Sequence, residues 1–410
     1  MSSVELDPRI LGQRITAARK SRGKTQEETS EFLGYSRPTY IAIEKGERLA
    51  RPEEIIKLAT FFGRNVNELV RTGEPVFDLQ PQLQAVAHKL KLDHHFQVGL
   101  NQAIGQLQDL AEDYLELEKL MASPNRVSYP PEVLLNSKLD PAEQAEVVAS
   151  QERNRLGLGD QPVIDLRSTL EWDVGLRIFY SRELPATVAG MYACSTELGA
   201  CILINRNHPP ERRRLSMLHE YGHCLLSTHR YKPGIDDLGQ SGRRPANERF
   251  AAAFALSFLM PSASVRQKFH DIVSGTGDFQ VADLCRLKHF YFVSLQAMTQ
   301  RVEQLGLIPR GTWDSLQESG FAPGRAEARL GLPSLSDPDD LVPDRYKYLA
   351  VHAYERGLLG ESDLAHYLRC DIATARETVA RVVTSQEVGS TGEELSLLLS
   401  FDTSLLSQSR

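Results

Sequence analysis

Two histidines and a glutamate near the middle of the chain have the spacing of a metal site. In His219-Glu-Tyr-Gly-His223 the histidines are four residues apart, so on a helix both imidazoles lie on one face. Such a pair can bind a single zinc ion, and Glu220 is placed to take a proton from the attacking water without binding the metal itself. The alternative is that both histidines only pack within a buried helix.

A catalytic zinc ion needs a third protein ligand and one open position. The segment from Glu248 to Pro261 reads as a second helix that is apolar almost all round, so we expect it to be buried against the first. A glutamate that opens a buried helix needs a partner, and a metal ion is one such partner. The alternative for Glu248 is a capping or helix-dipole role.

Several flanking motifs occur in a specific order. A strand ends in asparagine (Cys201-Ile-Leu-Ile-Asn205), an arginine-rich segment leads into HExxH, and Glu-x-x-Ala-x-x-Phe-Ala follows and ends in Leu259-Met-Pro261. From about Leu156 to Leu316 this order resembles the ImmA/IrrE metallopeptidases. The resemblance implies a zinc-dependent, gluzincin-like peptidase of narrow substrate range. It implies His219, His223 and Glu248 as ligands and Glu220 as general base.

The elements that position these residues are a small sheet and a loop. Residues 176–180, 188–192 and 200–205 are rich in β-branched or aromatic residues and predict three strands. In the family such strands flank the active-site helix, and an edge strand can hold an extended peptide. The loop 228–245 lies between the ligands and is a candidate lid, with His229 or Tyr231 as candidate oxyanion stabiliser.

Residues 9–71 predict five short helices. Thr25 and Glu28 form a capping box, Gly34 ends the second helix, and Ser36 caps the third. The stretches Gly23-Lys-Thr-Gln-Glu-Glu28 and Leu33-Gly-Tyr-Ser-Arg-Pro-Thr-Tyr-Ile-Ala-Ile-Glu-Lys-Gly46 resemble the XRE (lambda-repressor-like) helix-turn-helix family.

The resemblance implies a double-stranded DNA operator, with the third helix in the major groove. The residues that we expect to contact DNA, at base edges or phosphates, are Gln26, Ser36, Arg37, Thr39, Tyr40 and Lys45. Family members commonly bind palindromic sites, which implies a homodimer. The alternative is a protein-interaction module.

Composition and charge fit an ordinary soluble protein of several domains. The chain has 410 residues, of which 41% are hydrophobic and 25% charged, and we find neither a membrane-spanning run nor a signal peptide. The five cysteines show no CxxC pair, which favours reduced thiols in a cytoplasm. Residues 1–72 are net basic although the whole chain has a net charge of −7, as suits local contact with nucleic acid.

The expected fold is mainly α, of the α+β class, with a five-helix N-terminal domain, a zincin-like domain and a helical C-terminal region. The expected segments are a DNA-binding domain (1–73), a helical connector (74–135), a peptidase domain with a helical tail (136–320), a linker (321–342), and a small helical domain with a polar tail (343–410).

The fusion predicts a DNA-binding transcriptional regulator whose zinc endopeptidase cleaves a regulatory protein, in trans or itself, in a stress or phage-related response. Two linkers, Thr72–Pro75 and Ser123–Pro131, are candidate sites of self-cleavage. The alternatives are a transcription factor whose zinc domain only senses or scaffolds, and an antitoxin-like regulator.

Overall fold

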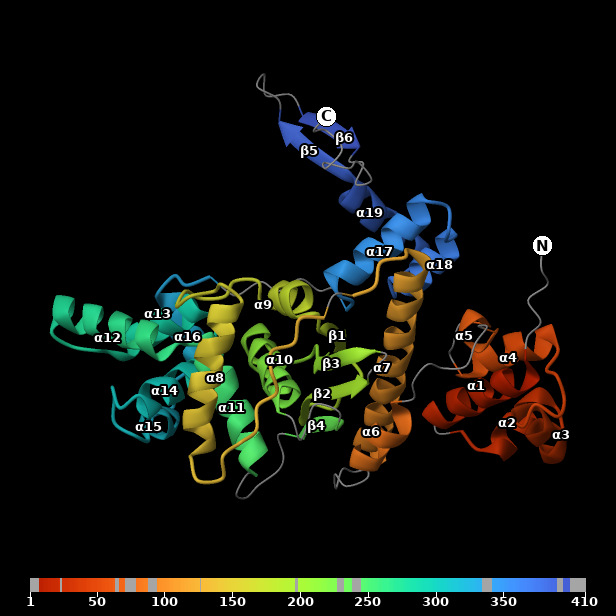
Figure 1. The fold of residues 1–410 in the computed structure, drawn as a ribbon, viewed down its shortest axis with the longest axis horizontal. Helices are drawn as coiled ribbons and strands as arrows, with labels where there is room; N and C mark the ends of the chain where they lie inside the picture. The colour runs from red at the N-terminus through yellow and green to blue at the C-terminus, as the bar shows by residue number, and fades with distance from the viewer. Residues whose placement is uncertain are drawn as a thin grey trace. The chain divides into compact units, whose positions relative to one another are not determined.

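The computed structural model describes most of the chain. The described residues are 7–22, 24–62, 66–70, 79–87, 94–125, 127–195, 198–226, 232–237, 245–333, 341–388 and 394–398. The chain divides into two compact units, residues 1–111 with 126–341 and residues 112–125 with 342–410. Figure 1 gives the order of the elements. The predicted fold class, mainly helical with a small sheet, is confirmed.

The N-terminal bundle has the five predicted helices. They are α1 (Pro8–Ser21), α2 (Gln26–Leu33), α3 (Arg37–Glu44), α4 (Pro52–Phe62) and α5 (Val66–Val70). The Thr25–Glu28 capping box is present, Ser36 accepts a hydrogen bond from the Thr39 amide, and Gly34 has the left-handed conformation. Local sequence signals therefore set the limits of α2 and α3.

A buried carboxylate fixes α3 within this bundle. Glu44, near the end of α3, accepts hydrogen bonds from Arg19 of α1 (2.6 Å), Gln26 of α2 (2.7 Å) and the Tyr40 hydroxyl (2.9 Å). Burial would raise the pKa of Glu44, but these donors and the charge of Arg19 lower it. One ionised group thus joins three helices.

The connector forms α6 (Gln80–Ala87) and the long α7 (His94–Leu120). The first part of α7 lies against the peptidase region. Ser181 donates to Gln106 at 2.6 Å, and a Cβ on Gly99 would stand 2.8 Å from the Glu183 carbonyl oxygen. A helix can approach the chain this closely only where the side chain is missing.

The sheet contains the three predicted strands and one more. They are β1 (Arg177–Ser181), β2 (Val188–Ser195), β3 (Gly199–Asn205) and β4 (Gly234–Asp237), in the order β1-β3-β2-β4. The pairs β2–β3 and β2–β4 are antiparallel, whereas β1–β3 is parallel. The edge strand β4 was not predicted, and it lies within the expected lid loop.

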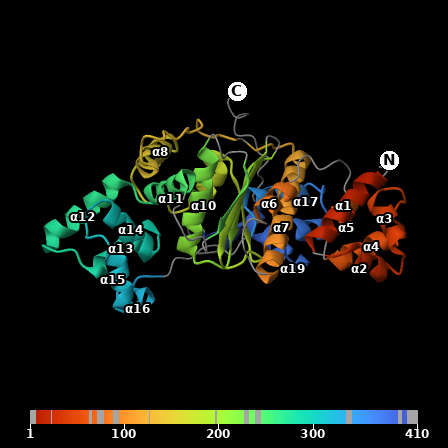
Figure 2. The same ribbon diagram turned by 90° about the horizontal axis from the view of Figure 1, so that it is seen from below.

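Even-numbered and odd-numbered residues of the strands project from opposite faces of the sheet. Ile178, Tyr180, Tyr192, Ile202 and Ile204 belong to the core that also contains the apolar side chains of α10 (Pro210–Leu225) and α11 (Ala246–Leu259). Side chains alternate along a strand, so the odd-numbered neighbours face the other way. Figure 2 shows the sheet edge-on, with α10 and α11 on one side and α6 and α7 on the other.

Further helices follow or flank the sheet in the first compact unit. They are α8 (Pro141–Arg155), α9 (Leu166–Thr169), the π-helical turn η1 (Leu170–Val174), α12 (Ser262–Thr276), α13 (Val281–Tyr291), α14 (Leu295–Gln304), α15 (Thr312–Glu318) and α16 (Pro323–Arg329). Within the predicted linker at Ser123–Pro131, the Ser128 amide donates to Val174, and the Tyr129 hydroxyl accepts from the Ala200 amide. This part of the predicted linker is therefore hydrogen-bonded to the domain.

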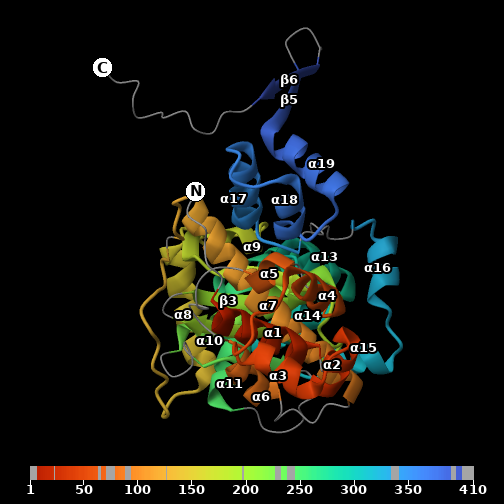
Figure 3. The same ribbon diagram turned by 90° about the vertical axis from the view of Figure 1, so that its right-hand side faces the viewer.

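The second unit joins the end of α7 to the C-terminal helices α17 (Asp344–Glu355), α18 (Glu361–Tyr367) and α19 (Ile372–Val383). A buried ion pair connects Arg345 with Glu118 (2.6 Å), and a partly buried one connects Arg369 with Asp113 (2.5 Å). The expected polar tail contains a two-stranded ribbon of β5 (Thr384–Val388) and β6 (Glu394–Leu398), which follows α19 in Figure 3. This ribbon was not predicted.

Within the described ranges, no helix is both long and apolar enough to cross a membrane.

Candidate metal centre

The helix that carries HExxH is held at its start by polar anchors. Arg213 donates to the carbonyl oxygens of Arg206 and His208, both at 3.0 Å, and Arg214 donates to those of Ile164 and Val163. Before the helix, Asn205 at the end of β3 donates to three carbonyl oxygens that precede or begin β2. These bonds fix α10 against the sheet and so explain why arginines and an asparagine precede the motif.

The two metal-site helices cross at a glycine. A Cβ on Gly222 would lie 2.9 Å from the Ala251 Cα and 3.2 Å from its Cβ. Gly222 lies between the two histidines, and Ala251 is three residues after Glu248. Because helices can approach closely only where side chains are small, this contact brings Glu248 to the two imidazoles.

The three predicted ligands converge. The Nε2 atoms of His219 and His223 are 3.2 Å apart, and they lie 3.3 and 3.4 Å from the two carboxylate oxygens of Glu248. Zinc bound tetrahedrally to nitrogen and oxygen at about 2.0–2.1 Å has ligand atoms separated by about 3.3 Å. Among the described residues this is the cluster whose ligand atoms could hold a metal ion. The spacing of these atoms fits zinc.

The pKa values of His219 and Glu248 indicate that the cluster favours bound positive charge. Burial would lower the pKa of His219, but the hydrogen bond with Glu248 raises it to about 9. Burial would likewise raise the pKa of Glu248, and the two histidines instead lower it. In both cases the anionic carboxylate favours positive charge at the imidazoles, which is the charge that a divalent cation would supply.

Glu220 lies with its side chain against strand β2 of the sheet. Its side chain is 1% exposed, and its Oε1 atom makes no hydrogen bond within the described residues. A Cβ on Gly190 of β2 would lie 3.3 Å from this oxygen. Burial raises the pKa of Glu220 well above its usual value, so the carboxylate is a stronger base than an exposed one.

Tyr221 has a structural role. Its hydroxyl, buried in the core, donates to Glu152 of α8 at 2.5 Å, and Arg155 donates to both oxygens of the same carboxylate. The phenol thereby ties the HExxH helix to α8. A leucine at this position could not make this bond.

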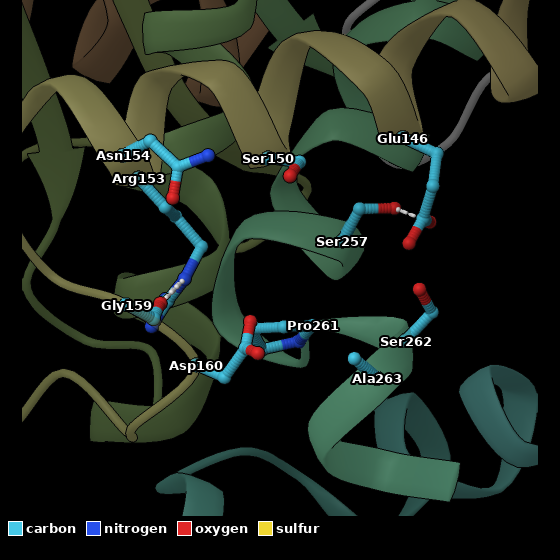
Figure 4. Close-up of a pocket in the computed structure, with 10 residues that line it drawn as sticks. All are labelled: Glu146, Ser150, Arg153, Asn154, Gly159, Asp160, Ser257, Pro261, Ser262 and Ala263. Carbon is cyan, nitrogen blue, oxygen red and sulfur yellow. Dashed lines mark hydrogen bonds between the residues drawn. The ribbon is translucent and has the colours of Figure 1, made fainter.

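A small pocket lies elsewhere, between α8, α11 and α12, with a volume of about 70 Å³ (Figure 4). Two of its charged residues, Arg153 and Glu146, already have protein partners. Arg153 donates to the carbonyl oxygens of Gly159, Gln161 and Phe258, while Glu146 accepts from Ser257 and Arg301. We therefore assign these polar groups to the packing of the helices.

Comparisons with known proteins agree with this architecture. The model of the IrrE N-terminal-like domain, a peptidase family, matches residues 173–303, which include both metal-site helices. The helix-turn-helix model matches residues 15–69. The chain joins a helix-turn-helix DNA-binding domain to an IrrE-type peptidase domain. The family resemblances drawn from the motifs are thus confirmed.

One relative is similar to the DNA-binding part. The cryptic phage CTXphi transcriptional repressor RstR of Vibrio cholerae is 35% identical over 69 residues, which is 17% of this chain and 62% of the repressor. The chain therefore spans about three fifths of the length of that relative.

The helix-turn-helix domain exposes three of the six predicted DNA contacts. The side chain of Arg37 is 55% exposed and that of Lys45 is 61% exposed, although each lies near a glutamate. Ser36 is exposed, whereas Gln26 and Thr39 are half-buried and make local hydrogen bonds. These five positions stay predictions.

The prediction for Tyr40 was wrong. Its side chain is 0% exposed, and its hydroxyl bonds to Glu44 inside the bundle. A tyrosine four residues before a buried glutamate lies on the inner face of α3. It cannot reach a base edge without unfolding the helix from the core.

The candidate lid is described in part. His229 and Tyr231, the candidate oxyanion stabilisers, fall outside the described residues. Strand β4 belongs to this loop; Asp236 on it pairs with Gly190 of β2, and its charge raises the pKa values of His219 and Glu220. Sequence reasoning did not single out Asp236, because a four-residue strand carries little periodic signal.

Proposed function

We propose that this chain is a transcriptional regulator whose zinc-dependent endopeptidase hydrolyses a peptide bond in a regulatory protein. The observation that carries the proposal is the joint geometry of His219, His223 and Glu248 with a buried Glu220 whose Oε1 makes no hydrogen bond within the described residues. A structural zinc site needs the first three groups only. A carboxylate next to them that can act as a base is a feature that hydrolysis requires.

His219, His223 and Glu248 would hold the zinc ion through two imidazole nitrogens and a carboxylate. The chemistry that a bound zinc ion supplies is polarisation of the scissile carbonyl and acidification of the attacking water. Glu220 accepts the proton of that water, which its raised pKa favours, and passes it to the leaving amine. Gly190 leaves room for Glu220 because it has no side chain at the contact.

The N-terminal domain supports operator binding, and the chain is proposed to act as a cytoplasmic homodimer on a palindromic site. A phage repressor as relative and a peptidase domain in the same chain favour a switch in a stress or phage-related response. The cleaved protein is then a repressor or the chain itself.

Self-cleavage at the predicted linker Ser123–Pro131 would require part of it to leave the domain. Residues 127–135 include backbone and side-chain hydrogen bonds to Val174, Ala200 and Leu225. A peptidase binds its substrate in an extended form, so these bonds would have to break first. The segment Thr72–Pro75, the other predicted cleavage site, lies outside the described residues and stays a prediction.

Replacing Glu248 with alanine tests the metal requirement. Roughly 10–16 kcal/mol of zinc-binding free energy is shared among the ligands, so losing one should cost about 3 kcal/mol, or about a hundredfold in affinity. We expect the purified wild-type chain to bind one zinc ion and to create new N-termini in a host protein extract, and the variant to do neither at the same free zinc concentration.

The control is Glu143→Ala, which removes an exposed carboxylate on α8. This variant should still bind one zinc ion and still create new N-termini. Wild-type zinc affinity in Glu248→Ala would refute the assigned ligand set. Cleavage by the wild-type chain that persists after chelation would refute the zinc mechanism.

Replacing Arg37 with alanine tests the DNA-binding surface. The side chain is exposed at the start of α3, where a helix in the major groove meets base edges. We expect a loss of about tenfold or more in affinity for an operator selected from random DNA, measured by fluorescence anisotropy. The control Lys57→Ala, which removes an exposed charge on α4, should change the affinity for the operator by less than about twofold. Equal losses in the two variants would indicate unspecific charge attraction only.

A further inference from the structure

Asp236 lies on the face of the sheet that looks towards the metal centre. It pairs with Gly190 across the antiparallel β2–β4 ladder, and residues directly opposite each other in such a ladder project from the same face. Gly190 faces Glu220, because a Cβ there would be 3.3 Å from the Glu220 carboxylate. The Asp236 side chain therefore projects from β4 towards the active-site side.

The electrostatics agree with this placement. Besides burial, the negative charges of Asp236 and Glu248 raise the pKa of Glu220, and Asp236 also acts on His219. Asp236 is half-buried, and within the described part of the chain its carboxylate has neither a hydrogen bond nor an ion pair. A partly desolvated carboxylate of this kind gains most from a cationic partner.

Asp236 adds a negative charge on the face of the sheet that looks towards Glu220, next to the place where the scissile bond must lie. A cationic side chain of a substrate on that face would be attracted to this carboxylate.

The position of β4 at the edge of the sheet gives a substrate a way to place a cationic side chain there. It is the last strand in the order β1-β3-β2-β4, so its outer edge has no strand partner among the described residues. An extended peptide that pairs with this edge places one side chain opposite Asp236, on the same face and about 5 Å away between Cβ atoms.

We propose that Asp236 is a specificity-determining residue that selects a substrate with lysine or arginine beside the scissile bond. The inference rests on the proposed peptidase function and deepens it by naming the substrate class. It also explains why a short strand ending in Asp-Asp is positioned at the active site.

The test measures binding, so that it does not depend on catalytic turnover. The probes are short blocked peptide hydroxamates, whose hydroxamate group binds zinc. Arginine or citrulline, its neutral isostere, occupies each of the three positions nearest the hydroxamate in turn. The dissociation constants of these peptides are measured by calorimetry on the zinc-loaded full chain. The proteins compared are the wild type, Asp236→Asn, Asp236→Lys and a control, Asp314→Asn. The control alters an exposed carboxylate on α15.

At one position we expect arginine to bind about tenfold more tightly than citrulline in wild type and in Asp314→Asn. The ratio should fall to about one in Asp236→Asn and reverse in Asp236→Lys, with zinc content unchanged. Hydroxamate binding without an arginine preference would overturn this inference and leave the peptidase proposal standing. A loss of zinc in Asp236→Asn would overturn it in favour of a metal-ligand role. If no hydroxamate binds the zinc-loaded wild type, both proposals fail.

Discussion

Replacing Gly222 with valine is expected to abolish zinc binding and peptidase activity together. Even a single Cβ at this position would lie 2.9 Å from the Ala251 backbone, and valine adds two methyl groups. The atom that it meets is a Cα, so no flexible side chain can move aside and α11 itself must shift. Glu248, on that helix, would then leave the two histidines.

The expected loss of stability from this substitution is about 1–3 kcal/mol, the usual cost of overpacking a core. Zinc content, thermal unfolding and cleavage are measured on the same preparations. The control is Gly275→Val on α12, where an added Cβ meets no atom within 4 Å. A Gly222→Val chain that holds one zinc ion with wild-type affinity would show that the helix crossing does not position Glu248.

Replacing Glu220 with glutamine is expected to lower the rate of peptide hydrolysis by about 10²–10⁴-fold while zinc content and operator binding stay unchanged. The substitution keeps the size of the side chain and removes only its ability to accept a proton as a base. Glu220 makes no hydrogen bond through Oε1 in the described structure, so little stability depends on its charge.

The matched control is Glu318→Gln, an exposed carboxylate at the end of α15. It should keep wild-type activity. Full activity in Glu220→Gln would require a different base and would remove the main argument against a purely structural zinc site.

Much of the centre could be predicted because its signals are local. The spacing of His219 and His223 defines one helix face, and Glu248 opens an apolar helix that ends before Pro261. Caps such as Ser36 set helix starts in the N-terminal bundle by the same kind of short-range bond. These features need no knowledge of the tertiary structure.

What could not be predicted depends on partners far apart in the sequence. The Tyr40 hydroxyl bonds to Glu44 within a hub that also requires Arg19, so the helical pattern alone did not reveal which way Tyr40 faces. Strand β4 exists only by pairing with β2, some 45 residues earlier. The ion pair between Arg345 and Glu118 joins positions 227 residues apart.

The most direct test of the central claim compares protein N-termini, by mass spectrometry, in host cells that carry the wild-type chain or Glu220→Gln, with and without DNA damage. Both proteins should be present at equal levels and bind the same operator. We predict at least one new N-terminus in wild-type cells that is missing from Glu220→Gln cells, and this terminus identifies the substrate. Identical sets of N-termini under every stress, with operator binding intact, would contradict the account and indicate a transcription factor whose zinc domain is structural.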